Sequence, residues 1–183
     1  MNAPAEPNRH LIGAAVKRKE DYRFLTGGGQ YTDDVMQANQ SYAVFLRSPY
    51  AHARIKSIDA DAARKLPGVL AVLTGEDLAA DKVNGLPCGW LIHSIDGSPM
   101  KEPPHPVIAQ GKVRHVGDQV ALVVAESVKI AKDAVEMIDV EYDELPAVAD
   151  TATAAGHAGH VHDEAPDNRC YTWGCGDKAA TDA

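Results

Sequence analysis

Three histidines near the carboxyl end of the chain have the spacing of a possible metal site. His157, His160 and His162 form an H-x-x-H-x-H pattern among small and acidic residues. Neutral imidazoles can bind zinc when a fixed geometry brings them together. The surrounding segment shows no periodic apolar pattern, so a metal would first have to order it. We therefore favour a solvated linker over a metal site here.

The cysteines offer a second set of metal ligands. Cys170 and Cys175 have a C-x4-C spacing, whereas zinc ribbons use two tighter pairs. Cys88 is the third cysteine and lies far away in the sequence. An odd number of cysteines without a disulfide framework favours free thiols in a reducing compartment, so we expect a cytoplasmic protein.

Two motifs resemble the beginnings of catalytic sites. Gly27-Gly28-Gly29 could form a phosphate loop, but no Gly-Lys-Ser/Thr follows, so a turn is favoured. Arg47 and Ser48 with His52 could support serine chemistry, but no nucleophile elbow and no orienting acid accompany them. A strand end with buried polar groups is the better interpretation of this second motif.

Carboxylates gather at Asp33-Asp34 and in residues 139–143. Paired carboxylates can transfer protons inside a closed pocket. Along a strand, however, neighbouring side chains alternate between faces, so a solvated edge is favoured. From these comparisons we assign no catalytic, cofactor-binding or metal-binding residue to this chain.

Short apolar runs predict the strands that would position these residues. They cover residues 42–46, 53–58, 69–73, 113–116, 120–124 and 140–142. Two main helices are predicted between them, at 60–65 and 127–138, with Asp59 and Ser127 at their starts. The second helix has one apolar face, formed by Ile130, Ala131, Ala134, Val135 and Ile138. Thr74 is expected to cap a further helical turn.

A long irregular segment, residues 81–111, is rich in Gly and Pro. Loops of this length are usually functional or face a partner. The segment contains Trp90, Ile92 and Met100, whose apolar side chains favour a partner interface over folding back onto the core.

The strand and helix order predicts a compact α/β domain with a mixed sheet and two main helices over residues 15–150. Residues 1–14 are expected to form a flexible arm without a visible signal peptide. Residues 151–183 are expected to be an irregular tail that leads toward further domains. The chain ends without an element that would complete this tail, which suggests a fragment of a longer protein.

Composition narrows the class of protein further. The 183 residues are 45% hydrophobic and 24% charged, which is typical of a globular protein. The formal net charge of -8 argues against nucleic-acid binding. No apolar run reaches the length needed to span a membrane.

Blocks along nearly the whole chain resemble the start of the molybdenum-binding large subunit of the xanthine dehydrogenase, aldehyde oxidase and carbon monoxide dehydrogenase family. The order and spacing of these blocks along the chain resemble those of the family, as do their residues. PCGW at 87–90 with Ile92-His93 is similar to the carbon monoxide dehydrogenase branch. GDK at 176–178 resembles a position after which the family's chains run on. The main blocks are RKED at 18–21, FLTG at 24–27, YTDD at 31–34, RSPYAHARI at 47–55, PGV at 67–69, LTGEDL at 73–78, HP at 105–106, VRHVG at 113–117, VA at 120–121, AKDA at 131–134, VEY at 140–142 and LPAV at 145–148.

The resemblance implies an α/β-hammerhead fold and an architectural role. Intact enzymes of this family oxidise or hydroxylate a substrate with oxygen from water. Electrons pass from molybdopterin cytosine dinucleotide to iron–sulfur clusters and FAD on partner subunits. The family's cofactor loops and catalytic glutamate lie beyond the hammerhead region, so the resemblance implies no cofactor and no complete active site in this chain. The implied partners are the remaining molybdopterin-binding portion of the large subunit and the iron–sulfur and flavin subunits.

Two other functions remain as alternatives. A stand-alone barrel-sandwich-like carrier would present a modifiable lysine at a tight hairpin. Gly111-Lys112-Val113 approaches this pattern but lacks the characteristic flanking residues. A small self-contained enzyme would need a convergent polar site, and the sequence shows none.

Overall fold

A computed structural model describes residue 13, residues 15–157 and residues 159–182. The predicted arm, residues 1–14, lies almost wholly outside the described residues. The chain divides into two compact units, Met1–Gln40 and Ser41–Ala183.

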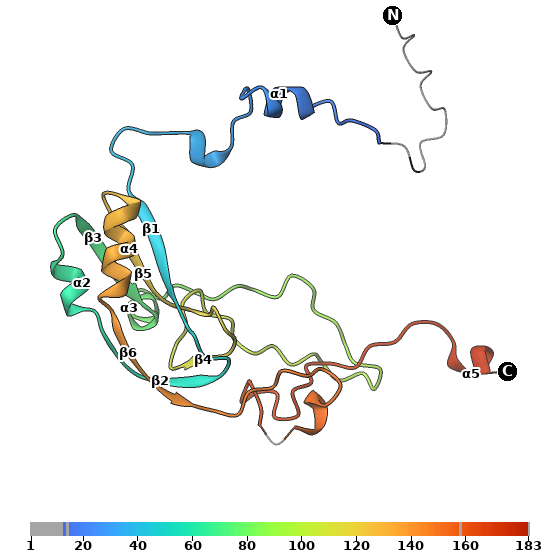
Figure 1. The fold of residues 1–183 in the computed structure, drawn as a ribbon. Helices are drawn as coiled ribbons and strands as arrows, with labels where there is room; N and C mark the ends of the chain where they lie inside the picture. Colours follow the sequence, from blue (N-terminus) through green and yellow to red (C-terminus); the bar gives the residue numbers. More distant parts are fainter. Residues whose placement is uncertain (1–12, 14, 158, 183) are drawn as a thin grey trace, which may run out of the picture. The chain divides into compact units, whose positions relative to one another are not determined.

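The first unit contains a short helix and a 3-10 turn joined by the glycine segment (Figure 1). Helix α1 spans Asp21–Leu25 and η1 spans Thr32–Asp34. Gly27 has a φ of 75°, and the backbone N–H of Gly28 donates to the carbonyl of Arg23 at 2.8 Å. Glycine adopts this left-handed conformation without strain, which lets the chain leave the helix in a tight turn. The predicted turn is therefore present.

The second unit contains two antiparallel three-stranded sheets. Sheet A has the order β1-β5-β3, and sheet B has the order β4-β2-β6. The bounds of the sheet A strands are Tyr42–Arg47 (β1), Val69–Thr74 (β3) and Gln119–Ala125 (β5). Those of the sheet B strands are Ala53–Asp59 (β2), Lys112–Val113 (β4) and Asp139–Glu144 (β6).

The α/β class is confirmed, but the single mixed sheet that the sequence predicted is wrong. Helix α2, Asp61–Lys65, connects β2 to β3, and helix α4, Val128–Glu136, connects β5 to β6. Each connection therefore leaves one sheet and enters the other. Because neither helix returns to its own sheet, no parallel pair forms, and every paired strand in the described residues is antiparallel.

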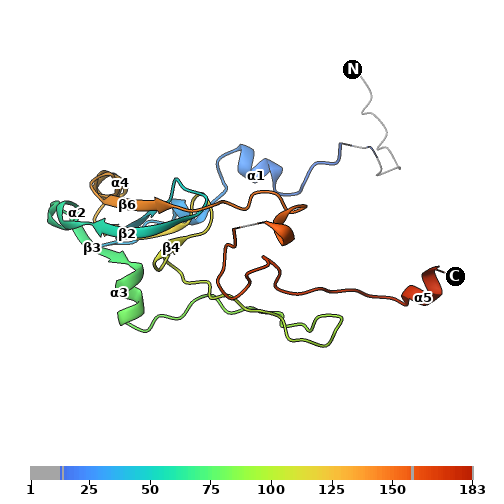
Figure 2. The ribbon, with the colours of Figure 1, turned by 90° about the horizontal axis from the view of Figure 1, so that it is seen from below.

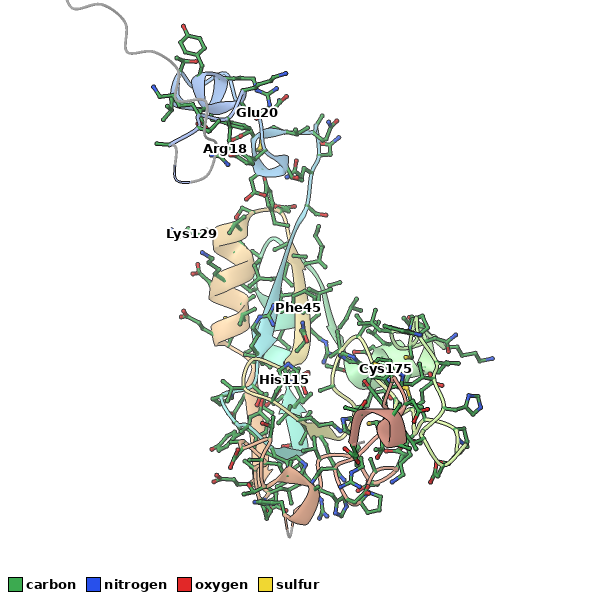
Figure 3. All side chains as sticks on the ribbon, turned by 90° about the vertical axis from the view of Figure 1, so that its right-hand side faces the viewer. Arg18, Glu20, Phe45, His115, Lys129 and Cys175 are labelled. Carbon is green, nitrogen blue, oxygen red and sulfur yellow. The ribbon has the colours of Figure 1, made fainter. Side chains whose placement is uncertain are left out.

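The main core lies between sheet A and the two helices α2 and α4 (Figure 1). The small residues Ala131 and Ala134 are fully buried, so α4 can approach the sheet closely. Ser127 caps this helix, because its Oγ accepts a hydrogen bond from the N–H of Ile130 at 3.2 Å. Lys129 lies on the side of α4 that faces away from the strands (Figure 3). The predicted division of this helix into an apolar and a wet face is confirmed.

Thr74 caps a longer helix than the single turn predicted. Helix α3 spans Gly75–Ala80, and its first turn carries a reciprocal capping box. The N–H of Thr74 donates to Oδ2 of Asp77 at 2.7 Å, and Thr74 Oγ1 accepts from the N–H of Asp77 at 3.4 Å. Hydrogen bonds from the hydroxyl and the backbone of Thr74 lower the pKa of Asp77.

The strand predicted at 113–116 is much shorter than expected. Strand β4 ends at Val113, because the N–H of Arg114 donates to Asp118 Oδ2 at 2.9 Å and is lost to the sheet. Gly117 then reverses the chain with a φ of 88°. This turn leads directly into β5 and brings several polar side chains together.

Candidate functional site

A pocket of about 300 Å³ opens beside the turn between β4 and β5. Three separate stretches of the second unit line it: the end of the long loop, this turn and the C-terminal segment. Figure 3 labels His115, which belongs to the turn. The ionisable and thiol groups on its wall are His105, Arg114, His115, Asp118, His162 and Cys170.

Hydrogen bonds to the chain around Ser48 hold the β4–β5 turn in place. The backbone N–H of Ser48 donates to the carbonyl of Asp118, and the N–H of Gly117 donates to the carbonyl of Ser48, both at 2.8 Å. Arg47 Nη1 donates to the carbonyl of Gly117, also at 2.8 Å. The sequence blocks at 47–55 and 113–117 are thus neighbours in space, and together they set the position of Arg114.

Ser48 and His52 do not form a nucleophile and base. Ser48 is 2% exposed, and its Oγ accepts from the N–H of Tyr50 at 3.0 Å. His52 is 4% exposed, and its Nδ1 lies 2.9 Å from the carbonyl oxygen of Pro146, so this nitrogen is the donor. These contacts fix the backbone, as expected for a strand end with buried polar groups.

The C-terminal wall of the pocket is a folded loop organised by Asn168. The Asn168 amide donates to the carbonyls of Ala154 at 3.0 Å and Gly159 at 2.9 Å, while its oxygen accepts from the N–H of Val161 at 2.9 Å. Lys112 Nζ pairs with the Asp163 carboxylate at 2.8 Å. These hydrogen bonds give the described residues of this stretch a defined path although the sequence lacks an apolar pattern, while the expectation that residues 151–183 link to further domains stays a prediction.

The three C-terminal histidines do not converge. His157 Nδ1 accepts from the N–H of Gly159 at 3.0 Å, and His160 Nε2 lies 3.2 Å from Asp163 Oδ1. His162 is half-buried in the pocket wall. Across the described part of the chain, no group of three or more His, Cys, Asp or Glu side chains could hold a metal ion.

The remaining candidates are scattered. Cys88 and Cys175 are exposed, Cys170 is half-buried, and all three are free thiols. The acidic side chains of β6 are exposed along the edge of sheet B, as the alternation of strand faces predicted. Sequence reasoning missed the pocket, although Arg114 and His115 stand together in one of the blocks that it singled out.

Burial and positive charge combine around His162. Burial lowers the pKa of His162, and the positive charge of Arg114 lowers it further. Two buried nitrogens in the pocket wall, Arg114 Nε and His162 Nδ1, have no hydrogen-bond partner among the described residues. The pocket therefore holds donor or acceptor capacity that the described protein groups do not use.

Comparison with known proteins places this fold in one family. The sequence profile described as "Aldehyde oxidase and xanthine dehydrogenase, a/b hammerhead domain" matches residues 26–146. The chain is 40% identical to the carbon monoxide dehydrogenase large chain of Hydrogenophaga pseudoflava, over 100% of this chain and 24% of that protein. This agrees with the resemblance that the sequence blocks indicated.

Solved structures agree with this assignment. Quinoline 2-oxidoreductase from Pseudomonas putida 86 matches with a TM-score of 0.64 and 43% identity, over 78% of this chain and 17% of that chain. A Cu,Mo-CO dehydrogenase in its carbon monoxide reduced state matches with a TM-score of 0.61 and 39% identity, over 78% and 17%.

The chain thus spans about a quarter of the length of the curated relative and less of the solved chains. It therefore aligns with only part of each of these proteins. None of the helices in the described residues is long and apolar enough to cross a membrane. The family match covers both sheets and the helices between them, so the chain belongs to the aldehyde oxidase and xanthine dehydrogenase a/b hammerhead family, a family of molybdenum enzymes.

Proposed function

We propose that this chain is the structural and interface domain at the N-terminal end of a molybdenum hydroxylase large subunit. The subunit would belong to an aerobic carbon monoxide dehydrogenase or a related aldehyde or xanthine oxidoreductase in the cytoplasm. The chain would have no complete active site of its own. Its match to about a quarter of a carbon monoxide dehydrogenase large chain supports this assignment.

The observation that carries the proposal is a set of exposed large apolar side chains on the long loop and the C-terminal segment. We call it the loop patch and define it as Leu86, Trp90, Leu91, Ile95 and Trp173, each at least 60% exposed. The two stretches are joined, because the N–H of Ile95 donates to the carbonyl of Thr172 at 2.9 Å. Figure 2 shows both stretches extending beyond the strands. Large exposed apolar side chains in a group are typical of a protein interface.

The loop prediction is refined by this arrangement. Trp90 is 78% exposed and belongs to the loop patch. Ile92 and Met100 are half-buried instead. The backbone N–H of Met100 donates to the carbonyl of Ile92 at 3.1 Å, which closes a small hairpin-like turn. The loop thus folds partly onto itself while it presents its larger apolar side chains outward.

In this proposal the redox chemistry belongs to the rest of the enzyme. The described residues offer no convergent set of metal ligands, so they do not fit a metal centre. We place the molybdopterin cytosine dinucleotide in the remaining part of the large subunit, toward which residues 151–183 lead. Iron–sulfur clusters and FAD would lie on partner subunits. The carrier alternative is disfavoured, because Lys112 is ion-paired with Asp163 and its side chain is only 20% exposed.

The test is purification of a tagged copy of the full chain from the native host, with molybdenum, iron and flavin measured in what elutes with it. The expected result is a large complex that contains all three. A Trp90→Ser, Ile95→Ser variant should lose most of the bound metal, because two apolar anchors of the interface are removed. Leu70→Ser is the matched control: Leu70 is 57% exposed but lies on β3, away from the long loop in sequence.

A chain that elutes alone as a metal-free monomer, from cells that contain the active oxidoreductase, would contradict the proposal. If the loop-patch variant and Leu70→Ser lost metal equally, the loop patch would not be the interface of the proposed complex. Far-ultraviolet circular dichroism of each variant confirms that the sheets are intact before the comparison is made.

A further inference from the structure

We propose that the pocket between the β4–β5 turn and the C-terminal loop binds a small organic oxyanion, a phosphate monoester or a carboxylate, through Arg114. This site lies within the second unit of the chain. It does not depend on the interface role proposed above, and it can be tested without any partner subunit.

Arg114 is a cation without an acidic partner among the described residues. Its Nη1 makes one long hydrogen bond, 3.4 Å, to the carbonyl of Lys112. Its Nε is buried and has no hydrogen-bond partner in the same part of the chain. Its neighbour Lys112, by contrast, is neutralised by Asp163. A guanidinium with a buried, unsatisfied nitrogen is costly, and an oxyanion would satisfy it with charge-assisted hydrogen bonds.

The acidic groups near Arg114 do not fill this role. Asp118 lines the pocket, but its Oδ2 accepts from the backbone N–H of Arg114 at 2.9 Å and lies 3.7 Å from His115 Nδ1. Its carboxylate is therefore used to hold the turn. Asp163 is engaged by Lys112 and His160. Among the described residues, the side chain of Arg114 is left as the arginine without an acidic partner at the pocket wall, where Asp118 is the one lining carboxylate.

Histidines supply further donors around the same space. His105, His115 and His162 line the pocket together with Arg114. His162 Nδ1 is buried and unsatisfied, and the charge of Arg114 disfavours a second proton on this ring. A bound anion would offset the charge of Arg114 and accept a hydrogen bond from the imidazole.

The walls suit an organic group on the oxyanion. Apolar side chains form much of the lining: Pro103, Pro104, Pro106, Ala109 and Val161. The volume of about 300 Å³ lies at the lower end of the range for small-molecule sites and exceeds what one inorganic oxyanion fills. The proline rings fix φ at their own positions, which limits the conformations available to these walls.

The test is calorimetric titration of the full 183-residue chain with inorganic phosphate and with phenyl phosphate at low salt. Both should bind, with phenyl phosphate at least about tenfold tighter because its ring contacts the prolines. Arg114→Gln should weaken phenyl phosphate binding by about tenfold or more, since the charge-assisted hydrogen bonds are lost. Arg54→Gln, an exposed arginine on β2, is the matched control and should leave the affinity within about twofold.

A second measurement uses the unaltered chain, so its result does not depend on whether the Arg114→Gln variant folds. In a proton NMR titration, phenyl phosphate should raise the pKa of His162 toward the ordinary histidine value. Absence of saturable binding together with an unchanged His162 pKa overturns the site. Equal weakening by Arg114→Gln and Arg54→Gln also overturns it, because the attraction would then reflect overall charge. Equal affinity for both ligands overturns the assignment of an organic group.

Discussion

Arg47 Nη1 donates a hydrogen bond to the carbonyl oxygen of Gly117 at 2.8 Å, across 70 residues of sequence. This contact joins the end of β1 to the turn before β5 and so supports the backbone that presents Arg114. Replacement of Arg47 by Ala should lower the free energy of unfolding by about 1 kcal/mol, the net value of one such hydrogen bond. Urea denaturation measures the change, with Arg54→Ala as an exposed control. A loss no greater than that of Arg54→Ala would show that the contact is not needed.

Replacement of Thr74 can be followed by two measurements, stability and the pKa of Asp77, because Thr74 both caps α3 and forms hydrogen bonds with the Asp77 side chain. Thr74→Ala should destabilise the chain by about 1–2 kcal/mol through loss of the cap, whereas Thr74→Ser, which keeps the hydroxyl, should recover most of this. The pKa of Asp77 should rise in Thr74→Ala, because the threonine hydrogen bonds that lower it are weakened. Carboxyl NMR titration of both variants tests this. An unchanged Asp77 pKa in Thr74→Ala would contradict the capping geometry.

His162 predicts how stability depends on pH. Its folded-state pKa is lowered, chiefly by burial, from an ordinary value near 6.5. The unfolded chain therefore takes up the proton at higher pH than the folded chain does, so stability is full above pH 6.5 and falls as the pH drops through the folded pKa. His162→Gln, which cannot titrate, should show a shallower loss between pH 6.5 and the folded pKa. Thermal melts across this range, with exposed His93→Gln as control, test the difference.

Gly75 lies where a side chain would collide with the backbone. A Cβ at this position would meet the carbonyl oxygen of Ala109, which is buried and cannot move aside easily. Gly75→Ala should cost about 1–3 kcal/mol through overpacking. Gly89→Ala is the matched control, because a Cβ added to Gly89 in the long loop would meet nothing within 4 Å. A Gly75→Ala chain as stable as Gly89→Ala would show that the loop near Ala109 adapts freely.

Local features of the fold could be predicted from the sequence because they depend on neighbouring residues. Ser127 and Thr74 were expected to cap helices, and both do so through their own hydroxyl groups. The apolar runs around β3 and β5 were also correct, because these strands supply most of the buried core of sheet A. The short length of β4 could not be foreseen, since it depends on the hydrogen bond between Arg114 and Asp118.

The pairing of strands and the pocket could not be predicted in the same way. The number of sheets depends on which strands become neighbours, and the apolar runs that predict the strands contain no information on their pairing. The pocket joins residues near 105 and 115 with residues near 162, whose order comes from the polar contacts of Asn168. A search for apolar periodicity has no means of detecting such a segment. The Pro-Asp-Asn stretch at 166–168, whose residue types favour a turn, is the sequence signal that could have indicated it.

The acidic edge strand β6 has a consequence for how this chain behaves before any partner is present. Its outer edge is open in the described part of sheet B, and Asp139, Glu141 and Asp143 are exposed along it. An uncovered strand edge invites pairing with another molecule, and this is a common first step in aggregation. Two copies that approached through this edge would bring like charges together, so electrostatic repulsion opposes pairing between two β6 strands. Charge thus protects newly made chains from polymerising through this sheet.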